Sequence, residues 1–202
     1  MACSSESKLV GDAALPDARR MLDFWQWAFG DLCDDDIKGI FAEWMVGTLI
    51  GLPMATSRRV SWANSDLISG NGLRIEVKAT AYWQSWKLVN EDGSRKASPP
   101  PLNVNPSKVR FSGLQARTSL TPAGQKDSRH FKSDIYVFCL QNQTDPANWD
   151  ALQLANWEFY VLTKGELSSL GTGNSISLST LRRSHPALTA GGLQDRIRPL
   201  LE

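Results

Sequence analysis

The sequence predicts a mixed α/β (α+β) domain in which helices flank a mixed sheet. Apolar residues recur at helical spacing in the first 51 residues and again beyond residue 163. Strand-like segments lie between these two regions, and one of them is almost entirely apolar, as a central strand buried on both faces is. With 202 residues, of which 42% are hydrophobic, the chain is long enough to form a single domain over 1–202 with its own core.

Two helices are expected before the strands. The first spans 16–29, with Pro16 in its opening turn and Gly30 after its last residue. The second spans 34–51 and begins with three consecutive Asp residues, whose negative charge interacts favourably with the amino-terminal end of the helix dipole. In both segments apolar residues fall three or four positions apart, which places them on one face of each helix.

Five segments have the composition of strands: 58–62, 66–68, 73–80, 134–140 and 157–163. Between the third and the fourth of these, we expect an irregular stretch over 87–110 and the beginning of a short helix over 111–117. Short helices are expected to complete the chain over 164–170, 177–183 and 187–199. This order of elements is typical of a mixed sheet with helices on its faces.

The turn at 70–72, Gly-Asn-Gly, decides which residues of the predicted hairpin face each other. A two-residue turn at its last two positions would place Asp66 opposite Val77. A three-residue loop would instead place Asp66 opposite Glu76, because a shift of one residue reverses the face of every side chain. We expect the three-residue loop, with Gly72 in the left-handed conformation that such loops use. Two opposed carboxylates repel, so this arrangement requires a cation between them.

Glu76 and Lys78 lie two positions apart in the predicted strand and therefore share one face. The carboxylates of Asp66 and Glu76 and the carbonyl of Val77 are hard oxygen ligands that suit Mg²⁺, which binds few protein carboxylates and retains waters and substrate phosphate. Lys78 can hold an attacking water or stabilise charge that develops on phosphorus. The alternative is a simple ion pair between Glu76 and Lys78 on an exposed sheet face.

Asp66, followed across a hairpin by Glu76-Val77-Lys78, resembles the active site of the PD-(D/E)xK nuclease superfamily, which has the restriction-endonuclease-like fold. Ser65 precedes Asp66, where the motif of that family has Pro. In the family the acidic pair binds metal and the lysine assists the nucleophile. The resemblance therefore implies a metal-binding role for Asp66 and Glu76 and a catalytic role for all three side chains.

The resemblance covers about 34–163 and implies a core of αβββαβ type. The helix over 16–29 and the C-terminal helices over 164–199 would be additions to that core. It also implies hydrolysis of DNA phosphodiester bonds that depends on Mg²⁺, for which Mn²⁺ can substitute.

A third acidic residue is implied by the same resemblance. Many relatives, Holliday-junction resolvases and lambda-exonuclease-like enzymes among them, carry a further Glu on the helix before the first strand. Glu43 fits this position and is therefore a candidate catalytic residue. Gly39 and Gly47 lie one turn away on either side, and such small residues let a helix approach a sheet closely. The alternative is an ordinary carboxylate at the edge of a helix.

Basic side chains are concentrated in the middle of the chain. Residues 87–132 hold nine Lys and Arg against three Asp and Glu, a net charge of +6, whereas the whole chain carries +1. A segregated basic region is what a face for a polyanion requires, although a solvated loop is the alternative. In several relatives of the family a Gln downstream of the lysine contacts phosphate, and Gln84 fits this position. With residues of the basic region, the expected DNA-binding residues are Gln84, Lys108, Arg110, Gln115 and Arg117.

These observations predict a metal-dependent deoxyribonuclease, more closely a Mg²⁺-dependent endonuclease that acts on duplex DNA in restriction, the defence against foreign DNA. Two alternatives stay open. One is a repair or recombination nuclease specific for junctions or single strands, and the other is a catalytically inactive nucleic-acid-binding scaffold of the same fold. A chain this short would gain affinity by forming a homodimer, for which the C-terminal helices are the expected interface.

A cytoplasmic location without a membrane partner is expected. No apolar run approaches the roughly 18 residues of a membrane helix, and the first residues lack the apolar stretch of a secretory signal. The three cysteines, Cys3, Cys33 and Cys139, are odd in number and far apart, so they fit neither a disulfide framework nor a zinc site.

Overall fold

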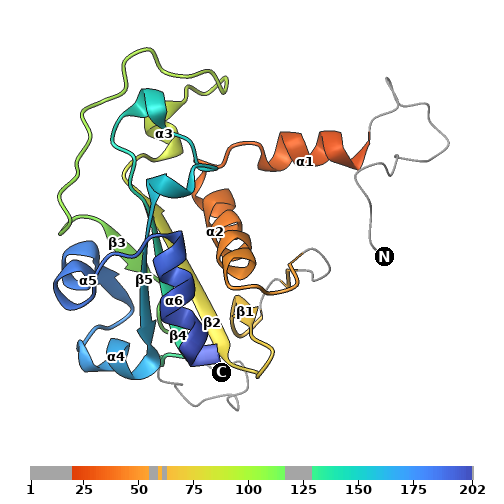
Figure 1. Cartoon of the computed structure of the whole chain (residues 1–202). Helices are drawn as coiled ribbons and strands as arrows, with labels where there is room; N and C mark the ends of the chain where they lie inside the picture. The colour runs from red at the N-terminus through yellow and green to blue at the C-terminus, as the bar shows by residue number, and fades with distance from the viewer. Residues whose placement is uncertain (1–19, 55–58, 61–62, 117–128, 202) are drawn as a thin grey trace, which may run out of the picture.

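A computed structural model of the chain describes residues 20–54, 59–60, 63–116 and 129–201. Its centre is a four-stranded mixed sheet with the order β1-β2-β4-β5 (Figure 1). The strands are β1 (Leu67–Ile68), β2 (Arg74–Ala81), β4 (Ile135–Gln141) and β5 (Trp157–Thr163). β2 runs antiparallel to β1 and parallel to β4, and β4 is antiparallel to β5. The predicted α/β class, a mixed sheet flanked by helices, is confirmed.

Helices and a small second sheet surround this centre. The helices are α1 (Met21–Phe29), α2 (Asp35–Leu49), α3 (Ser85–Leu88), α4 (Lys164–Ser169), α5 (Leu178–Ser184) and α6 (Ala190–Leu201). The second sheet pairs β3 (Arg110–Ser112) with β6 (Ser175–Ser177). None of the helices in the described part of the chain is long and apolar enough to cross a membrane.

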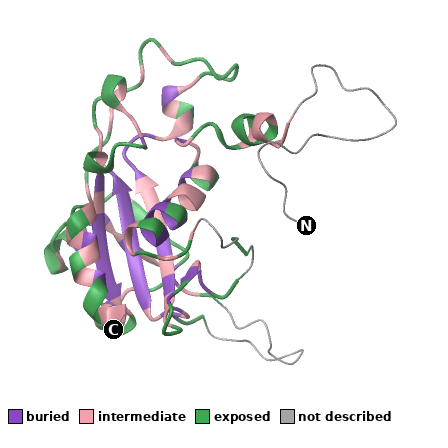
Figure 2. Ribbon diagram, turned by 45° about the vertical axis from the view of Figure 1, so that its right-hand side comes forward, coloured by how far each residue is buried: buried purple, intermediate pink, exposed green. Residues whose placement is uncertain are grey.

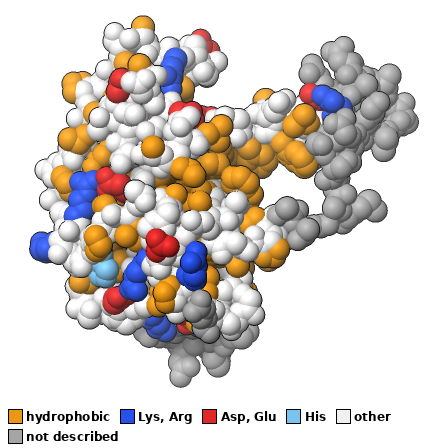
Figure 3. All heavy atoms as spheres, viewed as in Figure 1, with side chains coloured by type: hydrophobic (Ala, Val, Ile, Leu, Met, Phe, Trp, Pro, Cys, Tyr) orange, Lys and Arg blue, Asp and Glu red, His pale blue; other side chains and the backbone are white. Residues whose placement is uncertain are grey.

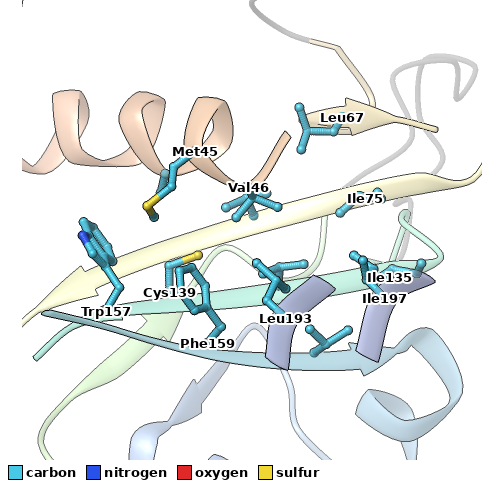
Figure 4. Packing of buried hydrophobic residues seen from close by; sticks show 14 of the residues in the cluster. Met45, Val46, Leu67, Ile75, Ile135, Cys139, Trp157, Phe159, Leu193 and Ile197 are labelled. Atoms are coloured by element: carbon cyan, nitrogen blue, oxygen red, sulfur yellow. The ribbon is translucent and has the colours of Figure 1, made fainter. Parts of the chain in front are cut away.

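One face of the central sheet is covered by α2 and α6 (Figure 4). Val46 of α2 packs there with Ile75 of β2, while Leu193 and Ile197 of α6 pack over β5, and all four side chains are buried. α2 begins as the acidic run predicts, because the Asp34 carboxylate accepts hydrogen bonds from the backbone N–H groups of the first turn. The apolar face of α6 is therefore part of the core of this domain.

The opposite face of the sheet is covered by α4, α5 and the β3–β6 pair. Tyr136 and Phe138 of β4 point to this side, where Phe111 of β3 meets Phe138 edge-on at 5.2 Å between ring centroids. β4 is buried along its whole length, and the sheet lies between its two covering layers in Figure 2. This confirms the prediction of a central strand covered on both faces.

Two predicted elements differ from the structure. Residues 110–112 form strand β3, whereas a short helix was expected to begin at 111, because Phe111 is buried and pairs with Ile176 of β6. Gly113 then adopts a left-handed conformation, with φ of +72°, which no helix continues through. In the predicted strand 58–62, the two described residues, 59 and 60, are not in a strand, and the others lie outside the described residues.

The long connection from β2 to β4 is mostly irregular, as expected, apart from α3, β3 and an isolated bridge between Val89 and Arg95. Between α2 and α3, the described residues form two strands, where the αβββαβ pattern has three. What the structure does provide is a hairpin, β1–β2, that lies beside α2 at one edge of the sheet (Figure 1).

Candidate active site

The turn between β1 and β2 is the three-residue loop that the glycines predict. Ser69 and Leu73 close it, with a distance of 3.0 Å from the Ser69 nitrogen to the Leu73 oxygen. Gly72 has φ of +87°, in the left-handed region. Leu67 faces Ile75 in the ladder, and the same register continued by one residue sets Asp66 opposite Glu76. The predicted register is confirmed.

Glu76 and Lys78 share the face of β2 that is opposite to α2. They alternate with Ile75 and Val77, which are buried against α2 in the core. Lys78 Nζ donates to Glu76 Oε1 at 2.5 Å, and Ser133 Oγ donates to Glu76 Oε2 at 3.1 Å. The ion pair of the alternative interpretation therefore exists, but it is half-buried beside a central strand rather than on an exposed sheet face.

Asp66 directly precedes the first residue of β1, and its side chain reaches the edge of β2 that β1 leaves unpaired. Its Oδ2 accepts a hydrogen bond from the Val77 N–H at 2.8 Å. The N–H and C=O of one strand residue point to the same side, so the Val77 carbonyl also faces this edge. Burial and the negative charge of Glu76 raise the pKa of Asp66 from 3.8 to about 6.

Glu43 of α2 is buried and comes to the same edge of β2. It lines a groove of about 330 Å³ together with Asp66, Val77 and Lys78. Both oxygens of its carboxylate are engaged by Arg59, at 2.5 Å from Nε and 2.8 Å from a terminal nitrogen of the guanidinium. The structure thus brings Glu43 to the predicted place and pairs it with a cation from the chain itself.

Arg59 was missed as a site residue by sequence reasoning. It lies 16 positions from Glu43, and in the structure residues 59 and 60 belong to neither a helix nor a strand. A second, smaller hollow of about 100 Å³ on the other side of the hairpin is lined by Asp66, Glu76, Lys132 and Tyr136. Asp66 therefore lines both hollows and Glu76 lines the smaller one, with Arg59 and Lys78 in the wall of the first and Lys132 in the wall of the second.

Three of the expected DNA-binding residues line one further hollow. Gln84, Lys108 and Arg110 surround it together with Lys87, a residue that sequence reasoning did not single out, and its volume is about 370 Å³. No Asp or Glu is among the described residues that line it, and we call it the basic hollow. It also borders Thr80, which is two residues beyond Lys78 in β2, so it lies near the candidate site.

Gln84 is fixed by the protein itself. Its side-chain oxygen accepts a hydrogen bond at 3.1 Å from Lys38, a fully buried lysine that also binds Asp35 at 2.6 Å. Gln115 does not line the basic hollow: its backbone N–H bonds to Asn174, next to the β3–β6 pair. Arg117 lies outside the described residues.

The residues at the edge of β2 fit a hard divalent cation in part. In the described ranges, no group of three or more His, Cys, Asp or Glu side chains is placed to hold a metal ion. Mg²⁺ needs only a few protein ligands when it also binds water and phosphate. The carboxylates of Asp66 and Glu76 and the carbonyl of Val77 match that number and type of ligand. Burial first, and then the negative charges of Glu76 and Glu43, raise the pKa of Asp66, while Lys78, which pairs with Glu76, offsets only part of this effect.

Comparisons with protein-family models, with curated proteins and with solved structures find no match for this chain. What the candidate site can do chemically therefore rests on its own geometry. That geometry consists of an acidic pair, a lysine on the same face and a neighbouring basic hollow.

Proposed function

We propose that this protein is a Mg²⁺-dependent DNA endonuclease of the restriction-endonuclease-like type, and that it acts in defence against foreign DNA. One observation carries the proposal: the register of the β1–β2 hairpin sets Asp66 opposite Glu76, with Lys78 next on the same face. These residue types in this order suit the hydrolysis of a phosphodiester, which needs a bound cation, an oriented water and a positive charge near phosphorus.

The roles of the side chains follow from their places. When bound, Mg²⁺ would polarise a phosphate oxygen and lower the pKa of a bound water. Asp66, Glu76 and the Val77 carbonyl would hold this ion at the edge of β2. The Lys78 ammonium, released from Glu76, would orient the attacking water and stabilise negative charge on the phosphate.

DNA as the substrate is supported by the basic hollow. The ammonium groups of Lys87 and Lys108 have no hydrogen-bond or ion-pair partner among the described residues, so they are available for phosphate. A strand whose scissile phosphate lay at Lys78 would continue over Thr80 into this hollow. Contacts of this kind fix the position of a DNA backbone without reading its sequence.

The proposal is tested by incubating the purified protein with plasmid, linear and single-stranded DNA in Mg²⁺ and in EDTA. We expect cutting in Mg²⁺ alone, and a loss of roughly 100-fold or more in rate for Glu76→Gln and for Lys78→Met, as when one preorganised electrostatic group is removed. Lys164→Met, at an exposed position on α4, is the matched control and should cut like the wild type.

Two results would contradict the proposal. If all three DNA substrates stay intact in Mg²⁺ and in Mn²⁺, the protein is not a deoxyribonuclease. If cutting occurs but survives both substitutions, the chemistry takes place elsewhere on the molecule.

A further inference from the structure

Helix α1 carries a row of aromatic side chains that the described part of the chain leaves exposed. Phe24, Trp25, Trp27 and Phe29, which we call the aromatic ridge, are all exposed or nearly so, and no residue of α1 is buried. Trp27 is the extreme case, with 85% of its surface exposed. Phe24 has its ring contacts with Trp27 and Phe29 of the same helix. Since lone exposed apolar residues are common but a row of four is not, the ridge marks an interaction surface.

An apolar groove lies next to the point where α1 joins the rest of the protein. It has a volume of about 470 Å³ and is walled by α2, the residues after it and β1, including Ile37, Phe41, Trp44, Leu52, Met54 and Ile68. Figure 3 shows hydrophobic side chains gathered over α1 and over the adjoining body. Trp44 and Ile68 are exposed at its walls. The molecule thus has both an apolar projection and an apolar recess.

The ridge does not fill the groove of its own chain. Of its four members, Phe29 alone is among the described residues that line the groove, because it is the last residue of α1. A nine-residue helix is about 13 Å long, and α1 leads away from the body (Figure 1). The other three side chains are therefore carried out of reach of the recess beside them.

We propose that the occupant of the groove is the aromatic ridge of a second copy of this chain. Each copy offers one ridge and one groove, so a two-fold arrangement satisfies both at once and closes the assembly as a dimer. The proposal does not depend on nuclease activity. The dimer it describes uses α1 and α2, at a place other than the C-terminal helices, where α6 already covers its own core.

The exposed apolar area is close to what a standard dimer interface buries. With about 200 Å² for a free large side chain, the exposed parts of the ridge, Trp44 and Ile68 amount to roughly 650 Å² per copy. A standard specific interface buries about 800 Å² per partner, and aromatic residues are enriched in its energetically important centre. Glu43, Arg59 and Asp66 form one end of the groove, so the second copy would lie beside the candidate active site.

The first experiment is sedimentation velocity of the full chain over a concentration series. We expect a dimer for the wild type, and dissociation at least 100-fold easier for Trp27→Glu on the ridge and for Trp44→Glu in the groove wall. Both positions are exposed, so the fold should survive, which circular dichroism checks. Trp86→Glu, at a Trp of α3 that is 59% exposed and does not line the groove, is the matched control and should remain dimeric.

The second experiment mixes the two defective variants in equal amounts. Trp27→Glu keeps an intact groove and Trp44→Glu keeps an intact ridge, so the mixture should form a heterodimer through one intact contact. It should therefore associate about 10-fold or more tightly than either variant alone. A wild type that stays monomeric at 100 µM, or a Trp86→Glu variant that dissociates as readily as the other two, would overturn the proposal. A mixture no tighter than its components would exclude the exchange of ridges.

Discussion

At the scale of single residues, the protonation of Asp66 is sensitive to the charges around it, including that of a bound cation. Asp66 is half-buried, it lies opposite Glu76, and it accepts a hydrogen bond from the Val77 N–H. Burial and Glu76 hold its pKa at about 6 instead of 3.8, so near neutral pH the folded protein carries a carboxylate that its surroundings disfavour. A bound cation would remove that cost. The effect of Asp66 on protein stability therefore reports metal binding in the absence of substrate.

Replacement of Asp66 by Asn should stabilise the protein in EDTA at pH 7.5 but not at pH 4. In the wild type, the folded protein binds the Asp66 proton more tightly than the unfolded chain does. The stability that this proton gives the wild type is complete below pH 4 and is lost as the pH rises through about 6, whereas the Asn variant is uncharged at both pH values. Asn keeps a carbonyl acceptor for the Val77 N–H and carries no charge. The advantage of the variant at pH 7.5 should approach, at most, about 3 kcal/mol in the free energy of unfolding.

Urea unfolding at both pH values, with and without Mg²⁺, measures this difference. Because ligands that bind only the folded state stabilise it, Mg²⁺ should stabilise the wild type at pH 7.5 and leave the Asn variant nearly unchanged. An advantage of equal size at pH 4 and pH 7.5 would show that the charge of Asp66 is not the cause. The comparison within one pH cancels the titration of all other groups.

Glu43 shows how a residue can be placed correctly and still have its partner missed. Its position on α2 was inferred from a resemblance, and it does line the groove with Asp66 and Lys78. Its carboxylate is held by two hydrogen bonds from Arg59, and paired charges of this kind are strong when one partner is buried. No periodicity in sequence can reveal such a pair, because it joins a helix to an irregular segment.

At the scale of elements, the β1–β2 hairpin does most to assemble the site. β1 has only two residues, and Asp66 directly precedes it, with its side chain bonded to the edge of β2. The three-residue loop sets which residues face each other, and Gly72 provides its left-handed position. A one-residue change of register would put Asp66 and Glu76 on opposite faces and separate the acidic pair.

Substitution of Gly72 by Ala should therefore cost about 1 kcal/mol in the free energy of unfolding. A Cβ at this position would meet nothing within 4 Å, so the cost comes only from the left-handed φ of +87°. Gly70→Ala is the matched control in the same loop, because its Cβ also has open space and its φ is outside the left-handed region. Urea unfolding of the two variants should separate them, and equal stabilities would contradict the role given to Gly72.

Local patterns predict some of these elements and cannot predict others. The glycines of the loop, the acidic start of α2 and the apolar run of β4 are signals contained in a few neighbouring residues, and each was confirmed. β3 and β6 have three residues each and are defined by their pairing across more than 60 positions. Phe111 is buried by that pairing, which the residues around it do not signal. The same holds for Lys38, whose partner Gln84 lies 46 positions away.

At the scale of the whole molecule, the fold gathers the basic charge of the middle region beside the acidic pair. Residues 87–132 carry the excess of Lys and Arg, and their side chains at 87, 108 and 110 line one hollow next to β2. The net charge of the whole chain, +1, does not reveal this arrangement. Charge segregation in sequence predicts a polyanion face, which stays a prediction, and the structure shows that Lys87, Lys108 and Arg110 of this region line one hollow.

The salt dependence of DNA binding should report this hollow directly. Each phosphate contact adds about 0.9 to the slope of log affinity against log salt concentration, so Lys87→Ala and Lys108→Ala should each reduce the slope by about 1. Both should weaken binding equally for unrelated sequences, because backbone contacts carry no sequence information. Lys164→Ala on α4 removes the same charge elsewhere and should leave the slope unchanged. Fluorescence anisotropy in EDTA measures binding without cutting, and slopes that match for all three variants would mean that DNA lies on another face.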